Sequence, residues 1–147
     1  MKPYSFRLDK ILDYRSYLRK KAQIDVFNAR NECLKREKEV LNLVEKRVEI
    51  SNKCSEEESI GMSVPVYHAY QAYLQRIKCD LEKAKIKLNE EKEEVIAKEM
   101  VLKQASINKK TLEVLKELKH KKYMEALGRE EQKTLDEIVI TGKGRST

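Results

Sequence analysis

Apolar residues recur every seven positions along the second half of the chain, and this repeat constrains the fold more than any other feature. Two series of positions carry it, Tyr67, Leu74, Leu81, Leu88, Val95, Leu102 and Tyr70, Ile77, Ala84, Glu91, Lys98, Ala105. Seven-residue spacing winds an apolar stripe slowly around an α-helix, so the stripe is dry only if a second helix follows it as a coiled coil. The sequence therefore predicts a long helix that needs a partner helix, and we call the facing stripes the seam.

The composition agrees with long solvated helices and excludes most other classes of fold. The 147 residues are 39% charged and 6% aromatic, with no Trp, four Gly and two Pro. Such a chain does not bury the large core of a layered globule. It contains no run of about eighteen apolar residues and no apolar signal segment near Met1. We expect a cytoplasmic protein with no direct membrane insertion.

The first half of the chain predicts a helix from about Phe6, with Ser5 as its cap. Its apolar residues are spaced by eleven, in the series Ile11, Ala22, Cys33, Val44 and again in Leu18, Ala29, Val40. Eleven residues over three turns correspond to about 3.67 residues per turn, which leaves a helix nearly straight. We expect the first arm to be less supercoiled than the second.

The strongest turn signals of the chain lie between Ser51 and Pro65. They include the acidic run 56–58, Gly61 and the Ser63-Val64-Pro65 stretch. A short reversal makes two helices antiparallel, so the first arm is the partner that the second arm needs. We predict an all-α fold in which two long helices form an antiparallel coiled-coil hairpin.

The predicted hairpin is a single unit over residues 1–141. Its arms cover about 6–52 and about 66–139, its turn covers about 53–65, and residues 142–147 form a disordered tail. Folding about Gly61 sets Val44 opposite Leu81, and Ile11 opposite Leu112. The first arm then runs out near residue 117, so the end of the second helix has no intramolecular partner.

Two irregularities mark that end of the second helix. After Ala105 the apolar stripe shifts register, as in a stutter, and continues through Leu112, Leu115, Lys119, Tyr123, Ala126. Gly128 then lies inside the unpartnered helix, where glycine costs about 1 kcal/mol relative to alanine.

No constellation for catalysis, metal or cofactor binding occurs in the sequence. His68 and His120 lie far apart, no Gly-rich phosphate loop is present, and no nucleophile lies beside a base. The three cysteines, Cys33, Cys54 and Cys79, have no CxxC spacing and are interpreted as free thiols. We expect a non-enzymatic protein without a cofactor.

The net charge of +7 does not indicate nucleic-acid binding. Lys and Glu alternate along both arms, and no aromatic residues interleave with a basic cluster. The distribution is uneven, however, because the end that carries both termini is basic and the turn end is acidic.

Three residues do not fit the predicted seam. Leu43, Ile50 and Tyr73 fall outside it and would form an exposed apolar patch near the turn. One interpretation is that these are scattered surface residues of the kind found on any protein. The other is a docking site for a protein partner, in which an exposed Tyr is a favoured anchor.

Both ends of the chain resemble the FliJ family of flagellar type III export proteins. The resemblance is carried by Phe6-Arg7-Leu8-Asp9-Lys10-Ile11-Leu12-Asp13-Tyr14-Arg15, by Lys121-Lys122-Tyr123 and by Glu131-Gln132-Lys133-Thr134-Leu135-Asp136-Glu137. It extends over the whole length, including the reversal after about sixty residues. The likeness implies an antiparallel coiled coil similar to the central stalk subunit of rotary ATPases.

The resemblance also implies a function and partners. A stalk of this family binds the hexameric ring of the flagellar export ATPase, promotes its assembly and activity, and couples it to the cytoplasmic domain of the membrane export gate, with export chaperones as further candidate partners. It is then held at the cytoplasmic membrane through the export apparatus. The implied ATPase-binding residues are Phe6, Leu8, Tyr123, Gln132, Lys133, Asp136 and Glu137. The implied gate-binding residues are Leu43, Ile50, Tyr70, Tyr73 and Ile77.

A second interpretation comes from a different class of protein. The chain would be a generic coiled-coil scaffold, or a chaperone for export substrates, with no ATPase partner. A stalk stimulates ATP hydrolysis by a ring that it binds substoichiometrically, whereas a scaffold does not.

Overall fold

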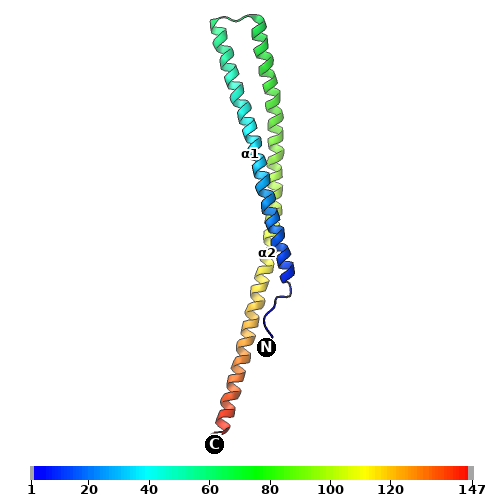
Figure 1. Cartoon of the computed structure of the whole chain (residues 1–147), viewed down its shortest axis with the longest axis vertical. Coiled ribbons are helices and arrows are strands. Elements are labelled where there is room, and N and C mark those ends of the chain that lie inside the picture. The colour runs from blue at the N-terminus through cyan, green and yellow to red at the C-terminus, as the bar shows by residue number, and fades with distance from the viewer. Residues whose placement is uncertain (1, 146–147) are drawn as a thin grey trace. The chain divides into compact units, whose positions relative to one another are not determined.

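The chain folds into two long helices, α1 (Asp9–Ile60) and α2 (Val64–Arg145), joined by a short reversal (Figure 1). The computed structural model describes residues 2–145, and side chains as far as Gly142. No strand occurs among these residues, and the two helices pack against each other. The predicted all-α helical hairpin is therefore confirmed.

The reversal between the helices is confined to residues 61–63 and depends on Gly61. This glycine has φ 116°, a left-handed conformation that side-chain-bearing residues rarely adopt. Its N–H donates to the carbonyl of Glu57 at 3.0 Å, and the N–H of Tyr67 donates to the carbonyl of Ser63 at 3.1 Å. Pro65 lies in the first turn of α2, where its missing N–H costs nothing. The predicted turn over about 53–65 was too long, because α1 stays helical through this stretch and buries Cys54.

Helix α1 begins three residues later than the sequence indicated. The N–H of Asp9 donates to the carbonyl of Phe6 at 3.1 Å, and the first helical bond runs from Leu12 to Leu8 at 2.9 Å. Asp9 lies in the first turn, where a carboxylate interacts favourably with the positive end of the helix dipole. Ser5 is therefore not the cap, and residues 2–8 precede the helix as a separate segment.

Helix α2 extends further than the sequence indicated. It runs past residue 139 to Arg145, so the helix includes residues 142–145, which we predicted to be disordered. No proline follows Pro65 to interrupt it, and the hydroxyl of Thr141 donates to the carbonyl of Glu137 at 2.8 Å. Residues 146–147 of the predicted tail lie outside the described part of the chain.

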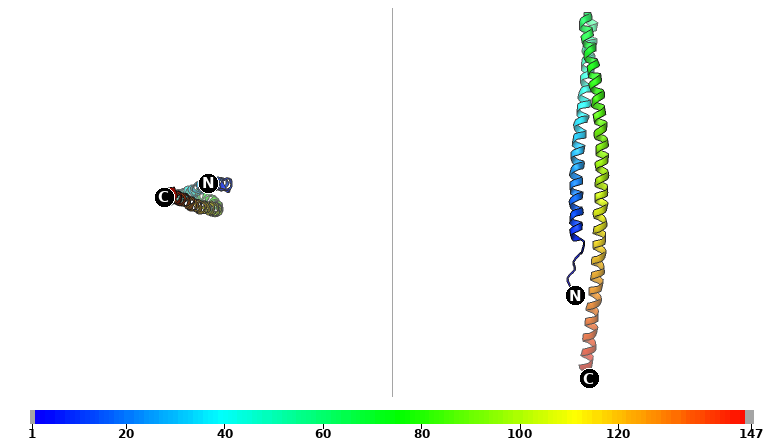
Figure 2. Two further views of the ribbon diagram at one scale, coloured as in Figure 1. Left: turned by 90° about the horizontal axis from the view of Figure 1, so that it is seen from below. Right: turned by 90° about the vertical axis from the view of Figure 1, so that its right-hand side faces the viewer.

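The hairpin divides into two compact units, and the larger one consists of Lys21–Leu102. In this unit the two helices lie side by side, as Figure 1 and the right-hand view of Figure 2 show. Its buried side chains are Ala22, Val26, Ala29 and Cys54 of α1, with Ile77, Leu81 and Ala84 of α2. The seven-residue repeat predicted for α2 is thus confirmed in this unit, although Tyr67 at its start is exposed.

Helix α1 also follows a seven-residue repeat in this unit, which the sequence interpretation missed. Apart from half-buried Asp25, the buried and half-buried positions are Ala22, Val26, Ala29, Cys33, Arg36, Val40, Leu43, Ile50 and Cys54. Val44, the last residue of the predicted eleven-residue series, is exposed, so that spacing does not continue along α1 in this unit. The small side chains and Arg36 at seam positions weakened the apolar signal of the true repeat.

Two polar contacts fix the pairing of the helices within Lys21–Leu102. The hydroxyl of Tyr70 donates to Oε1 of Glu57 at 2.7 Å, and Nη2 of Arg30 lies 2.9 Å from Oε1 of Glu99. Both pairs join α1 to α2 at similar distances from the reversal along each helix. This is the antiparallel pairing that folding about the region of Gly61 predicts.

The second unit consists of Met1–Lys20 with Lys103–Thr147. Nε of Arg19 donates to the hydroxyl of Ser106 at 3.3 Å and joins the two helices here. The seven-residue positions 109 and 116 of α2 hold half-buried lysines, and Leu112 and Leu115 are half-buried beside them. The seam thus continues through Lys109 and Lys116 with unchanged seven-residue spacing. The predicted stutter was wrong, because the seam positions change here from apolar residues to lysines and the spacing does not change.

The described residues carry neither a membrane-spanning helix nor a group of potential metal ligands. No helix among them combines the length and apolar character needed to cross a bilayer, and no cluster of three His, Cys, Asp or Glu side chains occurs. All three cysteines are free, with Cys54 buried, Cys33 half-buried and Cys79 exposed.

Candidate functional site

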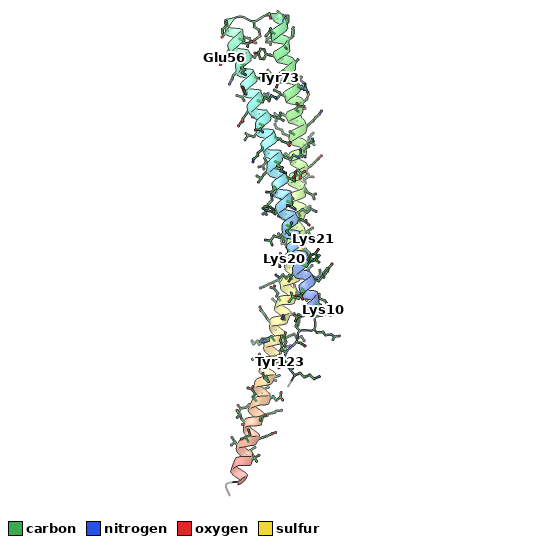
Figure 3. All side chains as sticks on the ribbon, viewed as in Figure 1. Lys10, Lys20, Lys21, Glu56, Tyr73 and Tyr123 are labelled. Carbon is green, nitrogen blue, oxygen red and sulfur yellow. The ribbon has the colours of Figure 1, made fainter. Side chains whose placement is uncertain are left out.

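The segment of residues 2–8 is tied to α2 by two tyrosine hydroxyls. The hydroxyl of Tyr4 donates to the carbonyl of Lys116 at 3.1 Å. The hydroxyl of Tyr123, labelled in Figure 3, donates to the carbonyl of Lys2 at 2.6 Å. The ring of Tyr4 also packs edge-on against His120, with centroids 4.9 Å apart, and is tilted against Tyr123 at 5.5 Å. The segment is therefore held along about two turns of α2 by hydrogen bonds and ring contacts.

Phe6 is the anchor of this segment. Its side chain is 8% exposed, and Nζ of Lys116 lies 5.9 Å from its ring centroid. The same ammonium donates to Oδ1 of Asp9 at 2.8 Å. This hydrogen bond to Asp9 is the main cause of a raised pKa of Lys116, which keeps the side chain charged. Lys116 thus fixes both the Phe6 ring and the first turn of α1.

A cleft opens between this segment and α2, and we call it the terminal cleft. It has a volume of about 760 Å³ and is lined by Tyr4, Ser5, Phe6, Arg7, Leu8, Leu115, Lys119, Lys122 and Tyr123. Three of the lining residues are cationic and none is acidic. No ion pair among the described residues involves Arg7, Lys119 or Lys122. The cleft is therefore a basic, aromatic surface suited to an acidic partner with apolar side chains.

Beyond the terminal cleft, α2 continues as residues 124–142, which we call the distal segment. After Leu127 every described side chain is exposed, including the four large apolar residues Leu135, Ile138, Val139 and Ile140. A hollow of about 480 Å³ lies along Leu127, Glu130, Glu131, Thr134 and Leu135. Nε2 of Gln132 donates to Oδ1 of Asp136 at 3.1 Å. The distal segment presents apolar and acidic groups that the folded chain does not cover.

The unit Lys21–Leu102 has its own hollow, next to the reversal. We call it the reversal hollow; it measures about 440 Å³ and is lined by Ile50, Glu57, Val66, Ala69, Tyr70 and Tyr73. Tyr73, labelled in Figure 3, is half-buried, and Nζ of Lys46 lies 5.4 Å from its ring centroid. A hydrogen bond to Tyr73 is the main cause of the raised pKa of Lys46. Two tyrosines with a cation beside them therefore surround this hollow.

Comparison with known families decides what kind of protein carries these sites. The model of the flagellar FliJ protein family matches residues 4–146. The chain belongs to the FliJ family. Membership assigns it to the components of flagellar type III protein export.

Comparison with solved structures found a more distant similarity. The structure of CT670 from Chlamydia trachomatis, proposed to be a YscO homologue, is 18% identical and has a TM-score of 0.48. The match covers 96% of this chain and 94% of that one. A similarity of this degree supports no conclusion about function. No curated protein matches the chain.

The ATPase-binding residues implied by the FliJ resemblance fall into two groups. Phe6, Leu8 and Tyr123 come together at the terminal cleft, where Phe6 is buried rather than displayed. The other four, Gln132, Lys133, Asp136 and Glu137, are exposed on the distal segment. Nine residues separate Tyr123 from Gln132, so the two groups are about 14 Å apart along α2. The implied ATPase-binding residues are therefore of two kinds. Those at the terminal cleft are held in place by contacts within the chain, and those on the distal segment are exposed.

The sequence interpretation missed the residues that organise the terminal cleft. Lys116 contributed only to the basic charge of the end that carries both termini, and Asp9 was not recognised as its partner, although their ion pair joins α2 to the first residue of α1. The sequence did offer a signal for this ion pair, because Lys116 occupies a seam position of the seven-residue repeat. A charged side chain at such a position needs a partner from the opposite helix.

The gate-binding residues implied by the FliJ resemblance do not form an exposed patch. Leu43 and Ile50 are half-buried at the seam of α1, and Ile77 is only 3% exposed. The prediction that Leu43 and Ile50 lie outside the seam was wrong, because α1 follows a seven-residue repeat. Tyr73 of α2 belongs to neither seam series and lines the reversal hollow. Tyr70 and Tyr73 remain accessible at the reversal hollow.

Proposed function

We propose that this FliJ-family chain is the central stalk of the flagellar export ATPase. In this role it binds the hexameric ATPase ring with the distal segment and the terminal cleft, and it promotes assembly and activity of the ring. It also engages the cytoplasmic domain of the membrane export gate, which holds it at the cytoplasmic membrane without inserting into it.

The observation that carries this proposal is the exposed apolar surface of the distal segment. Leu135, Ile138 and Ile140 are all more than half exposed on the distal segment of α2. Most of the stability of a helix in a protein comes from packing of its apolar face. A ring that surrounds the distal segment covers this face and stabilises the helix.

The anchored segment of residues 2–8 supports the same role. Phe6 and Lys116 hold it against α2, so the terminal cleft keeps its shape before a partner arrives. A preformed surface loses less conformational entropy on binding than a flexible one. Its cations, Arg7, Lys119 and Lys122, provide electrostatic attraction for acidic groups of the ring.

A stalk of this kind stimulates a ring by selecting among its conformations. Two different helices and one projecting segment have no rotational symmetry, whereas six identical ATPase subunits do. An asymmetric ligand binds some conformations of the subunits better than others and shifts their populations accordingly. This differential binding supplies the free energy that favours the assembled and active states.

The test is stimulation of the export ATPase by a truncated chain. Full-length protein, added below one copy per ring, raises the rate of ATP hydrolysis. A chain that ends at Leu127 loses this stimulation while keeping its helical circular dichroism per residue, because the seam lies before that position. A chain that lacks only residues 142–147 is the matched control and stimulates fully. Equal stimulation by the chain ending at Leu127 would contradict the proposal and favour the scaffold interpretation.

The proposed contact with the export gate lies at the reversal hollow. Tyr70 and Tyr73 line it, and aromatic side chains are favoured anchors at protein interfaces. Tyr73→Ala weakens binding of the gate cytoplasmic domain in a pull-down with purified proteins. Tyr14→Ala, which removes an exposed tyrosine outside the hollow, leaves binding unchanged. Equal binding by both variants would exclude the reversal hollow as the contact.

A further inference from the structure

Helix α1 carries a second apolar stripe, which the hairpin does not bury. Phe27, Leu34, Leu41 and Val48 recur every seven residues, and Ile24 lies three residues before Phe27. We call these five residues the outer stripe. All five are between 54% and 64% exposed, so the folded chain leaves them uncovered. Apolar residues that keep seven-residue spacing over more than three heptads are typical of a coiled-coil surface, whereas scattered surface residues have no fixed spacing.

The outer stripe lies on the side of α1 that faces away from its seam with α2. Two residues correspond to about 200° around a helix, which is nearly the opposite side. Four residues of the outer stripe each stand two positions before a seam residue of α1, namely Phe27, Leu34, Leu41 and Val48 before Ala29, Arg36, Leu43 and Ile50. Because both stripes repeat every seven residues, they stay on opposite sides along this part of the helix. A further helix can therefore pack on α1 without displacing α2.

The polar residues on and beside this face favour an antiparallel second copy of the chain over a parallel one. Asn31 and Lys38 lie on the face, and Arg30 and Lys35 flank it on either side. Parallel pairing in register sets Asn31 beside Asn31, which is favourable, but it also sets Lys38 against Lys38 and Arg30 near Lys35 of the second copy. Antiparallel pairing avoids both repulsions.

We propose that two copies of this chain pair through the outer stripes of their α1 helices, in antiparallel orientation. A two-fold axis next to Leu34 makes the two halves of the contact identical, with the two copies of Leu34 on either side of it. Ile24 then faces Leu41 of the second copy. Phe27 faces Lys38, whose alkyl stem covers the ring while its ammonium reaches water.

Charge complementarity selects this register. Arg30 of one copy lies opposite Glu37 of the other, and the symmetry makes this contact twice. Nη2 of Arg30 bonds to Glu99 at 2.9 Å, and the guanidinium has further N–H groups for a second carboxylate. No ion pair among the described residues involves Glu37. A shift of seven residues in one direction sets Glu37 against Glu37, and the opposite shift sets Arg30 against Arg30, so only the proposed register pairs opposite charges here.

The pairing does not depend on the contacts proposed for the ATPase and the export gate. No residue of the outer stripe lines the terminal cleft or the reversal hollow, and none belongs to the distal segment. Since polar residues such as Asn31 and Lys38 share the face, we expect a dissociation constant of about 10–100 µM. At about 1 µM the chain is then a monomer, and substitutions in the outer stripe leave its hairpin unchanged.

Sedimentation equilibrium of the full-length chain alone tests the pairing. Leu34→Glu raises the dissociation constant of the dimer by about tenfold or more, because it places a carboxylate beside the axis in both copies. Ile86→Glu is the matched control and leaves the dissociation constant unchanged, since Ile86 is 59% exposed on α2 of the same unit. Circular dichroism at about 1 µM checks that both variants keep the helical hairpin.

An exchange of charges tests the register. Arg30→Glu and Glu37→Arg each raise the dissociation constant by about threefold or more, because each sets like charges together in both halves of the contact. The double variant with both changes restores it to within about twofold, since opposite charges meet again. The loss of the Arg30 pair with Glu99 cannot produce this restoration, because Glu37→Arg does not replace that pair.

A monomer at concentrations up to about 1 mM would overturn the proposal. So would a dimer that Leu34→Glu leaves unaffected, or one that Ile86→Glu weakens equally. Tighter association of Arg30→Glu would show that position 30 faces Lys35 in a parallel pair and would contradict the antiparallel register. Because no ATPase is present, each of these results leaves the stimulation experiment to decide the proposed function independently.

Discussion

Tyr70 donates a hydrogen bond of 2.7 Å to Oε1 of Glu57 and thereby links the last turns of α1 to the first turns of α2. The bond closes the hairpin at the side of the reversal, where Gly61 supplies the turn. A carboxylate that accepts from a phenol stabilises the protonated phenol. The hydrogen bond to Glu57, followed by burial, therefore raises the pKa of Tyr70.

The first prediction follows from this raised pKa. Because the folded value lies above the unfolded value of about 10, the stabilisation is complete below about pH 10 and is lost as pH rises through the folded pKa. The ultraviolet absorbance of tyrosinate measures it. Tyr70→Phe removes a titration step that lies above the usual range of a tyrosine, and Glu57→Gln moves this step down towards that range. Loss of a step at ordinary pH in Tyr70→Phe would refute the prediction.

The second prediction concerns the apolar core of Lys21–Leu102. Leu81 is 4% exposed at the seam, whereas Ile86 on the same helix is 59% exposed. Leu81→Ala lowers the free energy of unfolding by about 2–3 kcal/mol, at the low end for buried leucine because a two-helix core is thin. Ile86→Ala changes it by about 0.5 kcal/mol or less. Urea unfolding followed by circular dichroism measures both, and a reversed order would show that the seam of α2 lies elsewhere.

The third prediction tests the repeat of α1 with two leucines. Leu43 is half-buried at a seven-residue position, and Leu41 is 56% exposed. Leu43→Ala therefore destabilises the hairpin by about 1–2 kcal/mol, in proportion to the apolar area that it buries. Leu41→Ala is the matched control and costs about 0.5 kcal/mol or less. Equal effects in urea unfolding would mean that Leu43 does not pack against α2.

The fold was predictable where the apolar repeat was strong. Leu74, Leu81 and Leu88 fixed the seam of α2, because leucine at seven-residue intervals has one consistent interpretation. The seam of α1 was not predictable in the same way, since Ala22, Cys33 and Arg36 occupy its positions and exposed valines lie beside them. The end of α1 was also predicted too early. The Ser, Asn and Glu residues near Cys54 favour a turn in isolation, but packing against α2 keeps this stretch helical.

The candidate site was predictable in its location and only partly in its construction. The resemblance brought Phe6 and Tyr123 to one end of the chain, and both line the terminal cleft. That Phe6 is buried could not be read from the sequence, because its burial depends on Lys116, which is 110 residues away. The carbonyl of Lys2, which accepts from Tyr123, is a backbone group and leaves no sequence signal at all.

The last prediction separates anchoring residues from residues that contact the ring. Phe6 holds the segment of residues 2–8 on α2, so Phe6→Ala releases this segment. We expect a local cost of about 2 kcal/mol, below the ~3–5 usual for a phenylalanine in a core, because the ring belongs to the segment of residues 2–8 and not to the seam of the paired helices. Trypsin cleavage at Arg7 becomes faster, and stimulation of the ATPase falls with it. Phe27→Ala removes an exposed phenylalanine of α1 and changes neither measurement.

Lys133→Ala gives the opposite combination, because this exposed lysine lies on the distal segment and anchors nothing. It lowers stimulation of the ATPase while Arg7 remains protected from trypsin. If Phe6→Ala left the protection of Arg7 intact, Phe6 would not be the anchor. If stimulation then still fell, the phenylalanine ring itself would have to touch the ATPase, and the segment would have to leave α2 in the complex. The two measurements on the same variant thus distinguish a preformed cleft from a segment that is released on binding.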